Sequence, residues 1–281
     1  MVQVWKRLFG AQAKVCAMLA VLASIALAQP QKTSSKKAEL LVRPAAAAAS
    51  SAQPVEKAGN PAPRRLEPEV FDETPDQAGI VAYAPRQGEG PWPIAVMLHG
   101  MCSEPERACR HFASTLSEQG FLVCPRARKR CDGGGSTWPQ SVQADVEAGI
   151  ERVKAAHAGQ IDDTRGRLLI GFSLGAFRGL DLAQNAHGEY PRVILIGAKI
   201  YPDPRRLRAA GVERLLLAAG DWDMMHGHMQ DRARLLQRQG FPAAFQSFGP
   251  VGHAFPANFP EILSRAVEWT QGDDQALIAR L

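Results

Sequence analysis

The pattern of apolar residues changes abruptly at Ser173, and the rest of the sequence is organised around this point. The apolar residues 168–172 are followed by a serine set between Gly171 and Gly175, and then by apolar residues at helical spacing. Because glycine has no Cβ, such a turn can be tight enough to hold the serine in a strained conformation clear of the sheet. The pattern predicts a strand, a sharp turn and a helix, with an exposed hydroxyl at the apex. A G-x-S-x-G motif alone is weak evidence for catalysis, so its context decides.

Three other segments supply that context. A predicted strand ends in His99-Gly100-Met101, and a later one, 215–219, leads into Gly220-Asp221-Trp222-Asp223. A loop near the end of the chain contains Gly252-His253. A serine, an acid and a histidine therefore follow one another along the chain, each close to the expected carboxyl end of a strand.

With these four segments, the sequence resembles the α/β-hydrolase family over about residues 79–269. Among the common folds that carry a catalytic triad, this is the one in which the serine, the acid and the histidine follow one another in that order along the chain. The resemblance implies a catalytic triad of Ser173, Asp223 and His253. It also implies an oxyanion hole formed by the backbone N–H groups of Met101 and Leu174.

The acid has alternatives, because Asp221 lies in the same loop as Asp223 and Asp203 follows an earlier strand. The resemblance favours Asp223 by its spacing, and Asp221 is expected to bond loop backbone instead. Asp203 is the third choice, since some members of the fold take their acid from that position.

The resemblance also indicates that His99 braces the oxyanion loop. We count His99, Trp222 and Met224 as candidate substrate-binding residues. His226 and His228 are two apart on an expected helix and point to different faces, so we expect no metal site there. A serine triad requires no cofactor, and none is expected.

Alternating strands and helices predict an α/β fold with a mainly parallel sheet, helices on both faces and ligands at the carboxyl ends of the strands. Only about fifteen residues follow the strand after which this family usually inserts a lid, so we expect no large lid domain. The segment 125–135 is expected to be an irregular loop. Expected strands are 78–84, 94–100, 121–124, 168–172, 192–197, 215–219 and 243–248; expected helices are 105–119, 138–157, 224–239, 259–270 and one after Ser173.

The first 65 residues differ in composition from the rest. Residues 1–28 combine a basic start, an apolar run and an Ala26-Leu27-Ala28 end, which indicates a signal peptide rather than a spanning helix. Residues 29–65 are rich in Ala, Pro, Ser and Lys and are expected to form a disordered linker. Residues 66–281 then form one catalytic domain. We expect a secreted or periplasmic protein without stable membrane insertion after cleavage.

The basic character of the chain belongs to the same N-terminal region. Residues 1–65 hold ten of the 33 Lys and Arg but only two of the 28 Asp and Glu, which leaves 23 basic and 26 acidic residues for the domain. The domain is therefore slightly acidic, and neither a basic patch nor a motif for nucleic-acid binding is expected.

Four cysteines are crowded into 30 residues of the predicted domain, which indicates two disulfides in an exported chain. Three pairings are possible. We favour pairs that each close one loop, Cys102 with Cys109 and Cys124 with Cys131. A four-cysteine metal site is the lesser option, because C-x-x-C spacing is absent.

Together these features predict an exported serine hydrolase that cleaves carboxylic esters, resembling the dienelactone hydrolases and small carboxylesterases. The expected substrate is a small ester or an acylated polymer. Two alternatives remain open: a serine peptidase related to the hydrolase domain of prolyl oligopeptidases, and a hydrolase-fold binding protein without catalysis.

Overall fold

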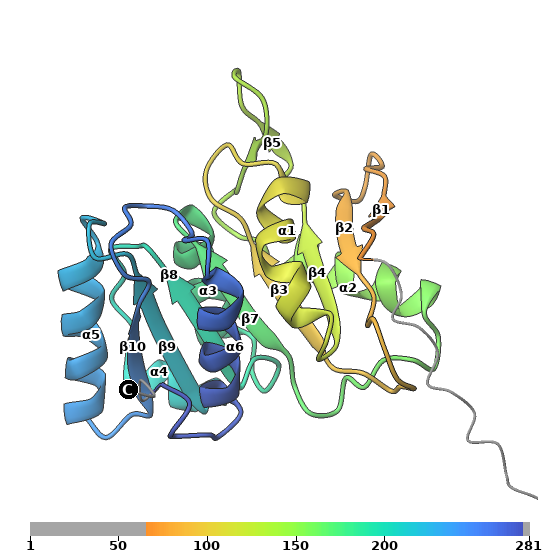
Figure 1. Cartoon of the computed structure of the whole chain (residues 1–281). Helices are drawn as coiled ribbons and strands as arrows, with labels where there is room; N and C mark the ends of the chain where they lie inside the picture. Colours follow the sequence, from red (N-terminus) through yellow and green to blue (C-terminus); the bar gives the residue numbers. More distant parts are fainter. Residues whose placement is uncertain (1–65, 278–281) are drawn as a thin grey trace, which may run out of the picture. The chain divides into compact units, whose positions relative to one another are not determined.

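The computed structural model describes residues 66–277, so the predicted signal peptide and linker lie outside the described residues. Eight strands form one sheet in the order β1-β2-β4-β3-β7-β8-β9-β10 (Figure 1). Within the described residues, no helix has the length and apolar character to cross a bilayer. The strands of the sheet are β1 (Glu69–Phe71), β2 (Ile80–Tyr83), β3 (Ile94–Leu98), β4 (Phe121–Pro125), β7 (Leu168–Phe172), β8 (Arg192–Ile196), β9 (Arg214–Ala219) and β10 (Ala243–Ser247).

The sheet is parallel except for β2, which runs antiparallel to both of its neighbours, β1 and β4. All other strand pairs are parallel. The inner parallel strands β3, β7 and β9 are nearly continuous apolar runs because both of their faces are covered. The prediction of a mainly parallel sheet is confirmed, although it missed the short β1.

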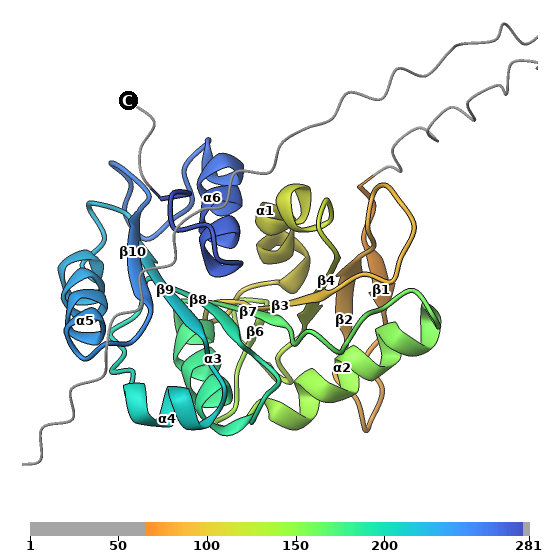
Figure 2. The ribbon, with the colours of Figure 1, turned by 90° about the horizontal axis from the view of Figure 1, so that it is seen from below.

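Helices cover both faces of the sheet, as Figure 2 shows. On one face α1 and α6 pack together, with the rings of Phe112 and Phe259 edge to face at 5.2 Å. On the other face lie α2, α3, α4 and α5. The segment between β8 and β9, residues 197–213, contains only the short helix α4, so no large lid is inserted there, as predicted. The helices are α1 (Pro105–Leu116), α2 (Gln143–Ala156), α3 (Leu174–Asn185), α4 (Pro204–Ala209), α5 (His226–Arg238) and α6 (Phe259–Thr270).

Two local predictions were wrong. The segment expected to be an irregular loop contains β5 (Lys129–Arg130), which pairs with β6 (Ser136–Thr137) in a small antiparallel hairpin. The helix expected from residue 138 begins only at Gln143. The reason is that Trp138 is buried outside the helix, where its indole N–H donates to the carbonyl of His99 at 2.7 Å.

The disulfide pairing also differs from our expectation. Cys102 pairs with Cys131, and Cys109 pairs with Cys124, with Cα–Cα distances of 5.7 and 6.1 Å. Cys109 lies on α1 and Cys124 on β4, and both are buried where this helix packs on the sheet. Cys102 faces the β5–β6 hairpin. The pairs therefore join separate elements in space instead of closing one loop each.

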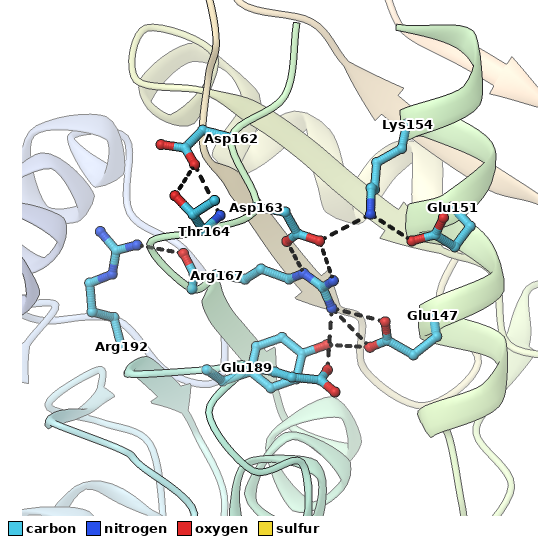
Figure 3. A network of polar contacts seen from close by, with 11 residues as sticks. Glu147, Glu151, Lys154, Asp162, Asp163, Thr164, Arg167, Glu189 and Arg192 are labelled. Carbon is cyan, nitrogen blue, oxygen red and sulfur yellow. Dashed lines mark hydrogen bonds and ion pairs between the residues drawn. The ribbon is translucent and has the colours of Figure 1, made fainter. Parts of the chain in front are cut away.

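A polar network surrounds the buried side chain of Arg167, just before β7 (Figure 3). Its guanidinium donates to Asp163 at 2.8 Å, to Glu147 at 2.9 Å and to Glu189 at 3.3 Å. The hydroxyl of Tyr190 also donates to Glu147, at 3.1 Å. The network ties the start of β7 to α2 and to the segment before β8.

Replacing Arg167 by methionine should lower the free energy of unfolding by about 3 kcal/mol. Removing one partner of a buried ion pair typically costs about 3–5 kcal/mol, and partial access to water for the carboxylates favours the lower end. Urea unfolding would measure the change. The control is Arg165→Met, because that side chain is 80% exposed and its ion pair with Asp162 should contribute little to stability. Equal costs for the two variants would contradict a structural role of the network.

The loss of unfolding free energy in Arg167→Met should also depend on pH. The hydrogen bond from Arg167 holds the pKa of Asp163 below its usual value. The stability that this pair contributes is therefore present above the ordinary aspartate pKa of about 4 and is lost as the pH falls through the lowered folded value. We expect the difference between wild type and Arg167→Met to shrink in acid, measured by unfolding at neutral and acidic pH.

Candidate active site

Ser173 lies in the turn between β7 and α3 with a strained backbone, φ 56° and ψ −118°. Its N–H donates to the carbonyl of Ile196 at 2.9 Å. A Cβ at Gly171 would lie 2.5 Å from the carbonyl oxygen of Gly175, and one at Gly175 would lie 2.0 Å from that of Leu98. Both glycines are therefore required for the turn, and the predicted strand, turn and helix are confirmed.

His253 and Asp223 are in direct contact. The imidazole Nδ1 of His253 is 2.7 Å from Oδ2 of Asp223, and the other carboxylate oxygen accepts from the N–H of Met225 at 2.9 Å. The Asp223 side chain is only 5% exposed, whereas that of His253 is 44% exposed. The imidazole stacks on Phe172, the residue before Ser173, with ring centroids 4.8 Å apart. The pair therefore holds a ring nitrogen in a fixed orientation beside the serine turn.

The two alternative acids are engaged elsewhere. Asp221 accepts a hydrogen bond from the Ser247 hydroxyl, and Asp203 caps α4 by accepting from the N–H of Arg205 at 2.8 Å. Among the three candidates, Asp223 is the carboxylate that contacts His253.

The loop after β3 lies directly beside the serine turn. A Cβ at Gly100 would lie 3.4 Å from the Cβ of Ser173. Leu174 is the first residue of α3, so its N–H has no acceptor within the helix. The N–H of Met101 likewise has no hydrogen-bond acceptor among residues 66–277. Two amide donors thus stand close to Ser173, at the positions that the sequence predicted for an oxyanion hole.

His99 braces this loop and does not line the cleft described below. It is 1% exposed, its Nδ1–H donates to the carbonyl of Gly100 at 2.8 Å, and its Nε2 accepts from the N–H of Ala127 at 3.4 Å. Burial lowers the pKa of His99 to about 4, so the ring is neutral at neutral pH. This environment fits the expected role of His99 as a brace for the loop. It does not fit contact with a substrate, because the side chain is buried outside the cleft.

The β5–β6 hairpin supports the same loop from outside. Cys102, directly after Met101, has a positive φ of 50° and is held by its disulfide to Cys131. Ser103 and Ser136 form a bridge in which the N–H of Ser136 donates to the carbonyl of Ser103 at 3.1 Å. The hairpin and the disulfide therefore fix the backbone that follows the Met101 amide.

Removing this disulfide should reduce both stability and activity. In the chain-entropy model a bridge across 29 residues contributes about 3.6 kcal/mol. If the Met101 amide is then free to turn away, turnover should fall toward the 10²- to 10³-fold loss typical of one oxyanion donor. The test is the double variant Cys102→Ser with Cys131→Ser, measured by urea unfolding and by ester turnover.

The other disulfide provides the matched control. The double variant Cys109→Ser with Cys124→Ser should lower the free energy of unfolding by a similar amount, about 3 kcal/mol. It should leave the loop beside Ser173 in place. Equal losses of turnover in the two double variants, at a temperature where both remain folded, would show that the Cys102–Cys131 bridge has no special role in the site.

A cleft of about 500 Å³ opens at this position. Ser173 and His253 both line it, although no hydrogen bond joins these two side chains among the described residues. The candidate substrate-binding residues Trp222 and Met224 also line it, and both side chains are largely exposed. Two lining residues were not predicted from the sequence, Phe177 and Lys199. The available signals were that Phe177 lies on α3 four residues after Ser173 and that Lys199 follows β8. The lining residues are Ser173, Phe177, Gly197, Ala198, Lys199, Trp222, Asp223, Met224, Met225 and His253.

Solved structures with a similar fold are known. The serine hydrolase FphF of Staphylococcus aureus, described as fluorophosphonate-binding, superposes with a TM-score of 0.55 at 15% identity, over 75% of this chain and 100% of that chain. The chain has the α/β-hydrolase fold. An esterase of Pyrobaculum calidifontis shares this fold with a TM-score of 0.54 at 16% identity, over 76% of this chain and 86% of that one.

An acylaminoacyl peptidase of Pyrococcus horikoshii is similar to this α/β-hydrolase fold as well, with a TM-score of 0.52 at 13% identity. The match covers 76% of this chain but only 42% of the peptidase. No family model and no curated protein sequence matches the chain. At these identities the comparisons establish the fold, and the chemistry has to be argued from the cleft.

Proposed function

We propose that the protein is an exported serine hydrolase that cleaves carboxylic esters with Ser173, His253 and Asp223. The observation that carries the proposal is the 2.7 Å contact between His253 and the buried Asp223, in one cleft with a serine on a strained turn. Strained serine backbones and buried carboxylate–imidazole pairs both need support from the surrounding structure, and here they occur together.

In the proposed reaction, the Ser173 hydroxyl attacks the ester carbonyl carbon while His253 accepts its proton. Asp223 keeps the proton of the imidazole on Nδ1 and stabilises the imidazolium that forms. The N–H groups of Met101 and Leu174 donate to the oxyanion of the tetrahedral intermediate. His253 then protonates the departing alcohol, and a water molecule releases the acid from the acyl-enzyme by the same steps in reverse order.

An ester substrate is placed before a peptide because several proteins of similar fold are esterases, and the site itself suits a substrate with an apolar part. The cleft is bordered by exposed apolar side chains and has no large lid from the segment between β8 and β9. Several proteins of similar fold are described as esterases, among them a ferulic acid esterase and esterase PE8. The similarity to an acylaminoacyl peptidase keeps peptide cleavage as the second candidate.

Export is proposed from the predicted signal peptide in residues 1–28. The two disulfides in the described residues agree with it, because disulfides persist in oxidising compartments.

A fluorophosphonate probe followed by a substrate panel would test this function. We expect covalent labelling of Ser173, located by mass spectrometry of the labelled peptide, and hydrolysis of p-nitrophenyl esters of graded chain length. Faster turnover of matched amides than of esters would favour the peptidase. Absence of both labelling and turnover would instead support a binding protein without catalysis.

A further inference from the structure

Lys199 is the one lysine or arginine among the residues that line the described cleft. Within residues 66–277 its ammonium group has no ion-pair partner within 4.0 Å and no hydrogen-bond acceptor. The cleft contains one acid, Asp223, whose two oxygens are engaged by His253 and by the N–H of Met225. A positive charge without a protein counter-charge therefore faces the same space as Ser173.

The loop that carries Lys199 is held in place on both sides. The N–H of Ile200 donates to the carbonyl of Ala198 at 3.0 Å, which makes Lys199 the central residue of a γ-turn. The N–H of Ala198 lies 3.3 Å from the sulfur of Met229, and the carbonyl of Ile200 is 2.8 Å from Nε2 of His228. The backbone of Lys199 is thus fixed relative to α5, while its side chain remains exposed.

Apart from Lys199 and the polar side chains of Ser173, Asp223 and His253, the cleft is lined by apolar residues and Gly197. Phe177, Trp222 and Met224 are among the few large hydrophobic side chains that the described surface exposes, and all three line this cleft. Contiguous exposed apolar groups of this kind mark binding sites. A ligand that complements both the apolar side chains and the charge of Lys199 has an apolar body and one anionic group.

From this arrangement we infer that Lys199 is a specificity-determining residue that binds a carboxylate on the substrate. The inference rests on the proposed ester hydrolysis and narrows its substrate class to half-esters, in which an apolar or aromatic ester also bears a free carboxylate. With the ester carbonyl at Ser173 and the apolar part on Trp222 and Met224, the carboxylate accepts charge-assisted hydrogen bonds from the Lys199 ammonium. Such a charge pair selects among substrates, because a neutral analogue leaves the ammonium without a partner.

The test compares p-nitrophenyl hemiglutarate with p-nitrophenyl pentanoate, which has nearly the same length but no carboxylate. The measured quantity is the ratio of the two kcat/KM values, anionic over neutral. In Lys199→Met, which retains an unbranched side chain of similar length but lacks the charge, this ratio should fall about tenfold, mainly through KM of the hemiglutarate. Lys199→Glu should lower it further because like charges then meet, and Lys199→Arg should retain it. High salt should lower the wild-type ratio, since the charge pair is partly exposed.

Lys129→Met is the matched control, because it removes the same charge from an exposed lysine outside the cleft and should leave the ratio unchanged. An unchanged ratio in Lys199→Met, or the same change in Lys129→Met, would overturn the inference while leaving ester hydrolysis intact. Hydrolysis of neither ester by the wild-type protein would contradict the proposed function itself, and the inference with it. The outcomes are distinguishable because the first two require measurable turnover of the pentanoate ester.

Discussion

Replacing Ser173 by alanine is expected to lower ester turnover by about four to six orders of magnitude. The loss is large because the three side chains of such a triad act as a unit, so that removing the nucleophile removes the whole covalent route. The fold should be retained, since alanine is smaller than serine and the turn depends on Gly171 and Gly175. Single-turnover kinetics with the best ester of the panel would measure the change.

Ser264→Ala provides a control for this prediction, because the same atom is removed from a serine on α6 whose hydroxyl bonds only Glu268 among the described residues. That variant should keep wild-type turnover and fluorophosphonate labelling. If Ser173→Ala retained comparable activity or labelled with the probe, Ser173 would not be the nucleophile.

Asp223→Asn is expected to reduce turnover by about 10⁴-fold, the size of the effect known for a triad aspartate replaced by its amide. An asparagine side chain can keep the contact with His253 but can donate to Nδ1, which stabilises the tautomer that cannot accept the serine proton. The pH–rate profile would complement the rate measurement, because the variant should recover activity in strong base if hydroxide replaces the histidine as the base.

The neighbouring acids make matched controls for Asp223. Asp221→Asn should have a far smaller effect, because Asp221 is turned toward Ser247, and Asp203→Asn should affect chiefly the capping of α4. A severe effect of Asp221→Asn together with a mild effect of Asp223→Asn would move the acid to Asp221. Two mild effects would point to Asp203.

Much of the candidate site could be predicted from the sequence, because its residues follow strands directly. The positions of Ser173, Asp223 and His253 require only that parallel strands end at the same edge of the sheet and that the turns are short. The preference for Asp223 over Asp221 depended on the spacing implied by the family resemblance, and in the structure Asp223 is the one of the two that contacts His253.

The pairing of the cysteines could not be predicted in the same way. Spacing along the chain favoured neighbours, whereas the observed pairs depend on α1 packing against β4 and on the β5–β6 hairpin reaching the loop after β3. Short strands such as β5 and β6 carry too few residues for a periodic signal. Lys199 was missed for a related reason, since an isolated exposed lysine has no sequence pattern, and only the fold places it in the same cleft as Ser173.

The nested order of the two disulfides has a consequence for biosynthesis. With export as proposed, an N-terminal signal delivers the thiols in sequence order, so Cys102 and Cys109 meet an oxidant before Cys124 and Cys131 arrive. Oxidation at that stage would join a non-native pair, because the native partners lie 29 and 15 residues further along the chain. The native pairs therefore require either that folding precedes oxidation or that thiol–disulfide exchange corrects the first bond. A yield of active protein that depends on a disulfide isomerase in the compartment where the chain folds would identify the second route.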